Sequence, residues 1–420
     1  MLGKIIKITN QLLFNRNLFD FLTPTTLIKD EEQSLINTAE VFESEVYEGR
    51  KVITFASARM AFYSIMSVLN IGKNDEVLLT GFTCSVMANA VLRRNATPVY
   101  ADIDLKTFGT CLNDVKNKVS ARTKVIVVQH TFGIPCDVGR IVEYAHQCGI
   151  FVIEDCAITY GSTINGMKCG TIGDFAISST DHTKPFSSVI GGYAVVNNNA
   201  YYDALKDYHD MLPELSSTHQ NAVKEQFLQD NYYQKHPKLF LLSQYFGAIK
   251  KKLGYKGTIA SLTFDSSSSY MNHGMYPYPA KMSNCIANIA LHSLREHKNR
   301  IPLLKEHANE IISILKDYGE DIDVYEDCSR DIVPLRIIYN PKHKVAASLI
   351  KQAMIDWIWF KSPIVYTNEP IESFGYHKGD CPNSEKISGI VMNIPLYTDE
   401  AKHRSMLHII KKAYSQTCKQ

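Results

Sequence analysis

The turn Ser57-Ala58-Arg59 has the residue types and the position to hold an anion. It follows the β-rich run 51–56 and leads directly into a stretch of helical periodicity at 59–69. Free backbone N–H groups at a helix start, with the positive end of the helix dipole behind them, bind phosphate or carboxylate groups. Every β-α unit has such a turn, so this motif alone favours simple capping of the helix by Ser57.

The apolar run that begins at residue 151 ends in two acids, Glu154 and Asp155. In parallel sheets, functional groups gather at the carboxyl ends of the strands. A carboxylate there could accept a hydrogen bond from a protonated ring nitrogen or bind a metal. No further acids cluster nearby in the sequence, which makes a metal the weaker alternative, and an isolated Asp155 could equally cap the following turn.

Lys184 lies in the polar segment 178–185, again directly after a β-rich run. A lysine in such a loop is usually just solvated, but a lysine that is partly desolvated near other cations has a lowered pKa, and its neutral amine can condense with an aldehyde. A phosphate cradle, a carboxylate for a ring nitrogen and a Schiff-base lysine, in this chain order, are the parts that hold pyridoxal phosphate (PLP). Their conjunction is far more specific than any single motif.

The elements that must position these residues alternate β-rich runs with helical stretches from about residue 51 to 199. This pattern predicts a mostly parallel sheet with helices on both faces, in a large PLP-binding domain at 51–200 after an N-terminal arm at 1–50. Helices are expected at 59–69 and 138–148. Seven strands are expected, at 51–56, 76–80, 97–102, 124–129, 151–154, 175–178 and 193–196.

The second half of the chain changes character. Residues 201–278 are rich in Tyr, Gln, Lys and Ser and are interpreted as an insertion or lid. Residues 279–420 are expected to form a long helical region and a small α+β C-terminal domain that closes over the first. The expected elements are helices at 282–294, 300–318 and 344–356, and strands at 322–325 and 332–339.

Composition excludes several classes of function. The 420 residues are 45% hydrophobic and carry a formal net charge of +2. This net charge is too small to attract nucleic acid or an anionic membrane through the electrostatic field of the whole protein. The ten cysteines form no CxxC pair and no zinc-like spacing, which predicts no metal and no disulfides and favours the cytoplasm. We find no signal peptide and no apolar run of the ~20 residues that a membrane span needs. The apolar and basic run 238–252 could lie on a membrane surface as an amphipathic helix, although such a stretch more often packs on its own domain.

The region from Ser57 to Val196 resembles the DegT/DnrJ/EryC1/StrS sugar aminotransferases, a branch of the fold-type-I PLP enzymes. The resemblance covers most of the chain except the N-terminal arm and 201–278. It rests on Ile71-Gly72-Lys73-Asn74-Asp75-Glu76-Val77, Ala88-Asn89-Ala90-Val91, Pro98-Val99-Tyr100-Ala101-Asp102-Ile103-Asp104, Arg122-Thr123-Lys124, His130-Thr131-Phe132-Gly133, Val152-Ile153-Glu154-Asp155, Gly170-Thr171-Ile172-Gly173-Asp174, Gly191-Gly192-Tyr193-Ala194-Val195-Val196, Met282-Ser283 and Asn393-Ile394-Pro395-Leu396-Tyr397.

This resemblance implies roles for individual residues. Lys184 corresponds to the Schiff-base lysine, which argues against the related dehydratases, where a histidine replaces it. Asp155 corresponds to the partner of the pyridine nitrogen and Ser179 to a serine that bonds the phosphate. Ala58 and Arg59, next to Ser57, occupy the backbone-donor positions.

The chain departs from the family pattern at several cofactor positions. Cys84 stands where an aromatic stacking residue is usual, and Ile158 replaces a glutamine near the phenolic oxygen of the cofactor. Pro279 stands where a neighbouring subunit often lends an asparagine to the phosphate. Phe82 could substitute in ring packing, and Arg59, in place of a threonine, could be a compensating cation. These departures resemble a divergent subgroup found with surface-polysaccharide genes.

The resemblance implies a homodimeric, PLP-dependent aminotransferase that moves an amino group from an amino acid, expected to be glutamate, to a nucleotide-linked keto-sugar. It also implies a shared active site, in which the loop 276–282 reaches the phosphate of the partner subunit with Lys281 close by. The alternative is a catalytically weak PLP-fold protein that acts as a binding or regulatory partner. The departures motivate this alternative, and the retained Lys184 and Asp155 oppose it. His130 and His182 are interpreted as packing and loop-stabilising residues.

Overall fold

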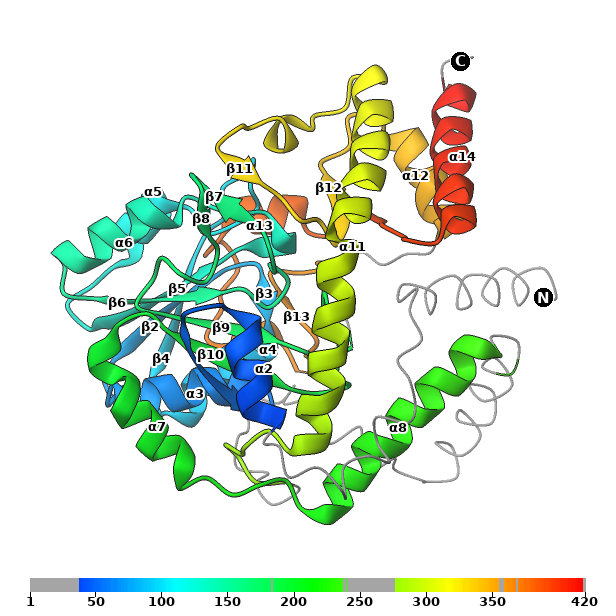
Figure 1. The fold of residues 1–420 in the computed structure, drawn as a ribbon. Helices are drawn as coiled ribbons and strands as arrows, with labels where there is room; N and C mark the ends of the chain where they lie inside the picture. Colours follow the sequence, from blue (N-terminus) through cyan, green and yellow to red (C-terminus); the bar gives the residue numbers. More distant parts are fainter. Residues whose placement is uncertain are drawn as a thin grey trace.

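A seven-stranded sheet forms the centre of the computed structural model, which describes residues 38–182, 184–236, 239, 276–354, 359–367 and 369–417 (Figure 1). The strand order is β1-β10-β9-β6-β5-β2-β4. Neighbouring strands are parallel except that β10 runs antiparallel to both β1 and β9. The strands are β1 (Lys51–Phe55), β2 (Glu76–Thr80), β4 (Thr97–Ala101), β5 (Thr123–Gln129), β6 (Phe151–Asp155), β9 (Phe175–Ser179) and β10 (Gly192–Val196).

Each of these strands begins and ends within one residue of its predicted bounds. The residues of β2, β9 and β10 are buried throughout, because helices cover both faces of the sheet. Such strands are near-continuous apolar runs, which makes them easy to locate in a sequence. The predicted mostly parallel, seven-stranded sheet is confirmed.

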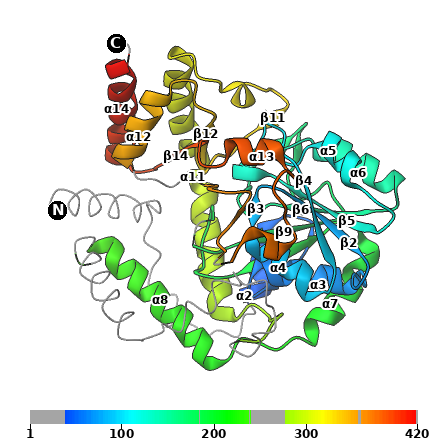
Figure 2. The same ribbon diagram turned by 180° about the vertical axis from the view of Figure 1, so that it is seen from behind.

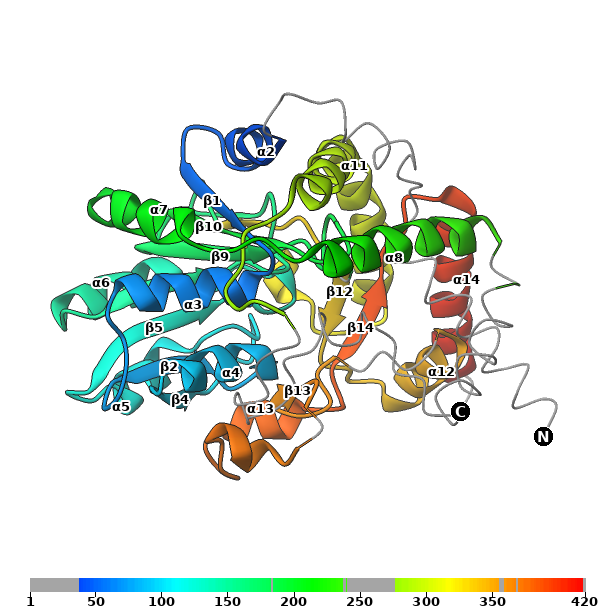
Figure 3. The ribbon, with the colours of Figure 1, turned by 90° about the horizontal axis from the view of Figure 1, so that it is seen from below.

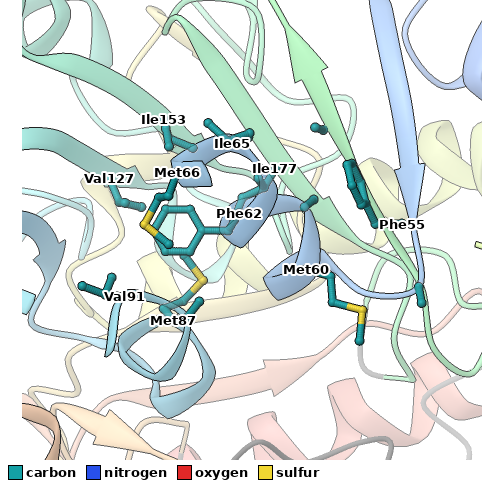
Figure 4. Close-up of a cluster of buried hydrophobic side chains, with 14 of the residues drawn as sticks. Phe55, Met60, Phe62, Ile65, Met66, Met87, Val91, Val127, Ile153 and Ile177 are labelled. Atoms are coloured by element: carbon teal, nitrogen blue, oxygen red, sulfur yellow. The ribbon is translucent and has the colours of Figure 1, made fainter. Parts of the chain in front are cut away.

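Helices α3 (Ala58–Val68) and α4 (Ser85–Arg93) cover one face of the sheet. Figure 4 shows Phe62 of α3 and Met87 of α4 packed toward strand residues such as Val127. Burying one side chain of this size contributes about 1.5–3 kcal/mol, so this layer holds α3 firmly on the sheet. The N-terminal turn of α3, where the predicted anion site lies, is therefore fixed relative to the strands.

The opposite face has its own clusters of buried side chains. One lies under α5 (Leu112–Lys118) and α6 (Val138–Gln147), and the other under α2 (Thr38–Val46) and the first half of α11. The remaining short elements are β3 (Thr83–Cys84), β7 (Thr163–Ile164), β8 (Met167–Lys168), β11 (Arg330–Asp331), β13 (Ile364–Val365) and α13 (Pro382–Ile387). Among them, β13 pairs in parallel with β3 and so joins the C-terminal part of the chain to the large sheet region.

One continuous helix, α11 (Asn284–Asp317), runs between the sheet and the C-terminal elements (Figures 1 and 2). The prediction of two separate helices at 282–294 and 300–318 is wrong, because the residues between them are helical too and Pro302 lies inside the helix. Both halves of α11 bury apolar side chains in separate cores. We infer that this packing outweighs the ~3 kcal/mol cost of an interior proline.

The C-terminal elements pack around a hydrophobic cluster of their own. Figure 2 shows these elements gathered at one end of α11. Strand β12 (Arg336–Tyr339) pairs antiparallel with β14 (Met392–Pro395), and helices α12 (Lys344–Met354) and α14 (Glu400–Thr417) cover them. The predicted small α+β part is confirmed. The predicted strand at 322–325 is wrong.

A 3₁₀ turn, Asp323–Tyr325, takes the place of that strand. Its backbone hydrogen bonds form within the turn: Tyr325 N–H donates to the carbonyl of Ile322, and Glu326 N–H donates to the carbonyl of Asp323. A short apolar run forms a strand only when a neighbouring strand offers it a partner, and sequence pattern alone does not supply that information.

Helices α7 (Tyr202–Asp210) and α8 (Ser217–Lys235) follow β10, and Figure 3 shows α8 leading away from α7 and the sheet. The run 238–252, considered above as an amphipathic helix, lies outside the described residues except for Leu239. Within the part of the chain that the structure describes, no helix combines the length and apolar character needed to cross a bilayer.

Candidate active site

The sheet topology brings three of the predicted site residues to one edge. Ser179 ends β9 and pairs with Gly192 of β10, which in turn pairs with Phe55 at the end of β1. Ser57 lies two residues after Phe55 in the chain. Asp155 ends β6, the strand beside β9 on its other side. Residues far apart in the sequence thus meet where the carboxyl ends of parallel strands lie together.

The turn at Ser57 has the features of a phosphate cradle. Ser57 is the N-cap residue of α3, but its side chain makes no cap hydrogen bond, and its buried Oγ has no hydrogen-bond partner among the described residues. A Cβ at Gly192 would lie 2.2 Å from the backbone nitrogen of Ala58, so only glycine lets β10 come this close to the first turn of α3. A buried, unpaired hydroxyl at the positive end of a helix is an environment that an anion satisfies.

Asp155 is buried at the same edge, and its Oδ1 accepts a hydrogen bond of 2.9 Å from the backbone N–H of Ala157. Burial raises the pKa of Asp155 above its ordinary value of 3.8, whereas the N–H of Ala157 and the charge of Lys184 act in the opposite direction. A cationic ring nitrogen against this carboxylate would favour its ionised form. Asp155 and Lys184 are thus within electrostatic reach of each other.

The adjacent acid, Glu154, has different surroundings, because neighbouring residues of a strand face opposite sides of the sheet. Its carboxylate lies 3.0 Å from Nε2 of His130 and accepts hydrogen bonds from the backbone N–H groups of Gly170, Ile172 and Gly173. His130 itself is fully buried. The interpretation of His130 as a packed, hydrogen-bonded residue agrees with these contacts, and Glu154 clamps the turn at 170–173.

Hydrogen bonds within the loop that contains Lys184 stabilise its conformation. The N–H of Lys184 donates to the carbonyl of Asp181 across 3.1 Å, and the N–H of Asp181 donates to Oγ of Ser179 across 3.3 Å. The hydroxyls of Thr180 and Ser188 are 2.6 Å apart and close the far side of the loop. The end of β9 and the lysine are therefore held as one unit.

Two further predicted residues, Cys84 and Arg59, lie close to this lysine. Burial raises the pKa of the Cys84 thiol, and the charges of Lys184 and Arg59 partly oppose that effect. The side chain of Arg59 is only 5% exposed, and its carbonyl accepts a hydrogen bond of 3.2 Å from the hydroxyl of Tyr278. The charges of Lys184 and Arg59 thus act on the Cys84 thiol, and the part that these residues take in cofactor binding stays a prediction.

Ile158 belongs to a buried cluster rich in aromatic side chains. Phe82 lies in the same cluster, with its ring centroid 5.8 Å from that of Phe132 and 4.6 Å from that of Phe360. These contacts account for Phe82 as a core residue. Its role in ring packing stays a prediction.

The loop 276–282 contacts the Ser57 turn of its own chain. The N–H of Ala56 donates to the carbonyl of Ala280 across 2.9 Å, and Nζ of Lys281 donates to the carbonyl of Asp210 across 2.7 Å. Pro279 lies in this loop, directly before Ala280. The loop therefore lies beside the cradle, and α7 holds the ammonium group of Lys281.

Sequence reasoning missed residues that reach the site from the C-terminal elements. Nζ of Lys184 lies 5.6 Å from the centroid of the Trp359 ring, and Cζ of Arg336 lies 5.3 Å from the same centroid. Tyr366 follows β13, and its carbonyl accepts a hydrogen bond of 2.9 Å from Ser85 Oγ. Only the rarity of tryptophan, which occurs twice in the chain, could have drawn attention to Trp359.

Comparisons with known proteins agree with this geometry. The profile of the DegT/DnrJ/EryC1/StrS aminotransferase family matches residues 32–235 and 247–411, so the chain belongs to this family. GDP-perosamine synthase of Escherichia coli O157:H7 is 34% identical over 170 residues, which are 40% of this chain and 47% of that protein. The match therefore spans about half the length of the curated relatives.

Two solved structures share the fold. PseC of Helicobacter pylori, an aminotransferase involved in the biosynthesis of pseudoaminic acid, superposes with a TM-score of 0.68 and 15% identity over 93% of this chain and 96% of that one. A Streptococcus pneumoniae protein in a PLP form gives a TM-score of 0.65 and 19% identity over 93% and 95% of the two chains. The fold-type-I assignment is confirmed, and PLP is the cofactor of this family.

The residues at the sheet edge fit that cofactor. The unpaired Oγ of Ser57 and the open first turn of α3 suit its phosphate, with Ser179 close by. Asp155 provides a buried carboxylate for a protonated ring nitrogen, and Lys184 supplies an amine within electrostatic reach of Asp155. Where the aromatic stacking residue would stand, Cys84 offers no ring.

Proposed function

We propose that the protein is a PLP-dependent aminotransferase that moves an amino group from an amino acid, glutamate, to a nucleotide-linked keto-sugar in surface-polysaccharide or amino-sugar synthesis. The observation that carries the proposal is the convergence of Ser57, Asp155, Ser179 and Lys184 on one edge of the sheet. Membership of the aminotransferase family and the partial similarity to GDP-perosamine synthase support it.

Each residue has a defined task in this proposal. Ser57, Ser179 and the backbone of Ala58 bind the phosphate, since N–H and hydroxyl donors at a helix N-terminus suit an anion. Asp155 holds a proton at the ring nitrogen by its negative charge. Lys184 would hold the cofactor through its amine, and the same amine would move the proton at the reacting carbon as general base and acid. When bound, PLP supplies a ring that withdraws electrons from that carbon.

The spectrum of the purified holoenzyme tests the proposal directly. We expect a visible absorbance band that bleaches when glutamate is added and returns when a nucleotide-linked keto-sugar follows. Borohydride reduction and peptide mapping are expected to find the cofactor on Lys184. A protein that binds PLP but shows no bleaching with any amino acid would instead be the binding or regulatory protein considered from the sequence.

We also propose a homodimer in the cytoplasm, with Lys281 or a neighbour near the phosphate of the partner subunit and residues 201–278 beside the substrate entrance. The contact between Nδ1 of His182, in the lysine loop, and Asp230 of α8, 3.5 Å apart, supports the position of residues 201–278 beside the entrance. The dimer itself rests on the family resemblance, since the loop 276–282 contacts the cradle of its own chain. All nine cysteines in the described residues are free thiols, which suits a reducing compartment. Light scattering that finds an active monomer would contradict the dimer.

A further inference from the structure

Trp359 connects the lysine loop with the C-terminal elements. The ammonium of Lys184 and the guanidinium of Arg336 both lie within cation–π distance of its ring, at 5.6 Å and 5.3 Å. The indole is 8% exposed and Arg336 is 5% exposed. The ring and the guanidinium of Arg336 thus form a small, largely dehydrated surface, and the nucleophilic amine of Lys184 lies beside the ring.

The indole N–H is a buried donor without a hydrogen-bond acceptor among the residues that the structure describes. The backbone of Trp359 is fixed, because its carbonyl accepts a hydrogen bond of 2.8 Å from Nδ2 of Asn393. Buried donors in native proteins are nearly always paired, so this donor calls for an acceptor that the described residues do not supply.

Arg336 adds positive charge at the same indole ring. Burial lowers its pKa to about 10, so the guanidinium stays protonated at neutral pH. Burial also raises the pKa of the nearby Tyr366 to about 12, which keeps that hydroxyl able to donate. A planar guanidinium matches a carboxylate with two parallel hydrogen bonds.

We propose that Trp359 and Arg336 bind a carboxylate of the amino-acid donor next to Lys184. This inference rests on the proposed function. The diphosphate of a nucleotide sugar offers similar anionic oxygens, but it lies several bonds from the carbon that receives the amine. The α-carboxylate of an amino acid is attached to the reacting carbon itself and therefore lies close to the lysine, where the indole and guanidinium are.

Two conservative variants test the assignment. Trp359→Phe keeps an aromatic ring and removes the N–H, while Arg336→Lys keeps the charge and removes the planar fork. Arg330→Lys is the matched control, because that guanidinium pairs with Asp327 and the carbonyl of Pro135. Calorimetry on the holoenzyme measures binding of glutarate, an unreactive dicarboxylate, and of UDP. Circular dichroism melting checks that each variant is folded.

We expect glutarate binding to weaken about tenfold in each test variant, the usual effect of one lost hydrogen bond to a charged group, with UDP binding unchanged. Absence of glutarate binding to the wild type, or unchanged glutarate binding in both variants, would overturn the inference. Weakened UDP binding with unchanged glutarate binding would assign the subsite to the diphosphate and also overturn it.

The donor half-reaction separates this inference from the proposed function. With glutamate and no acceptor, bleaching of the wild-type holoenzyme reports the proposed activity alone. A wild type that does not bleach contradicts the proposed function. If the wild type bleaches and both variants do so with an unchanged concentration dependence, only the carboxylate subsite is wrong.

Discussion

Glu154 accepts a hydrogen bond from Nε2 of His130 at 3.0 Å, with both side chains fully buried. The N–H of Cys136 donates to Nδ1 of the same imidazole, so Nε2 carries the proton that Glu154 receives. This contact, with the three backbone donors at 170–173, anchors the strand end from which Asp155 reaches the site.

Glu154→Gln is therefore expected to destabilise the protein. The change replaces a charged acceptor of several buried hydrogen bonds by an amide, which costs about 1.5–3 kcal/mol. Urea denaturation followed by circular dichroism measures it. Glu143→Gln, on the exposed side of α6, is the control and is expected to change the free energy of unfolding by less than about 0.5 kcal/mol. Equal stabilities of the two variants would contradict the anchoring role.

The same contact predicts an acid-sensitive stability. Burial alone would raise the pKa of Glu154, but the hydrogen bond from His130 and those from the N–H groups of Gly170 and Gly173 hold it below the ordinary value of 4.5. A carboxyl group with a depressed folded pKa stabilises the fold above its unfolded pKa and loses that contribution as the pH falls through the folded pKa. Wild-type stability is expected to fall on acidification below about pH 4.5 more steeply than that of Glu154→Gln.

Lys184→Ala is expected to lower kcat by at least about 100-fold, because the variant loses the amine that moves the proton at the reacting carbon. PLP should still bind through the phosphate and Asp155 contacts. Steady-state assays and equilibrium dialysis of PLP separate the two effects. Lys168→Ala, at an exposed position in β8, is the control and should keep wild-type rates. An active Lys184→Ala enzyme would rule out this lysine.

Asp155→Asn should lower the rate more than it lowers PLP occupancy. The amide cannot hold a proton at the ring nitrogen, so transition-state stabilisation is lost, by about 100-fold in kcat/KM. The control is Asp137→Asn, whose carboxylate pairs with Arg140 at the surface. If Asp155→Asn and Asp137→Asn have equal activity, another residue holds the ring nitrogen.

Gly192→Ala should impair cofactor binding. The added methyl group would meet the backbone of Ala58 at 2.2 Å, and moving the first turn of α3 costs about 1–3 kcal/mol. The apparent Kd of PLP and the melting temperature report the change. Gly139→Ala, in α6 with no atom within 4 Å of the new Cβ, is expected to stabilise the protein by about 0.5–1 kcal/mol and to leave PLP binding unchanged.

The sequence by itself determined the seven strands of the sheet and the order of the motifs along it. Strands buried on both faces are apolar runs, and the polar residues that follow them mark the strand ends, so local pattern is sufficient to place Ser57, Asp155 and Lys184. The family resemblance then assigned roles to those positions. Both signals are local, which is why they can be found without coordinates.

Only the tertiary structure decided which residues share one site. The register of β1, β10 and β9 brings Phe55, Gly192 and Ser179 into line, and the packing of both halves of α11 overrides the proline that predicts a break. Trp359 reaches Lys184 from more than 150 positions away in the chain, and Arg336 reaches the same indole ring. Strand pairing and side-chain packing between residues so far apart depend on the whole folded arrangement. The free energy that selects these contacts comes from the packing of one element on another, and residues that are neighbours in the sequence contribute little to it.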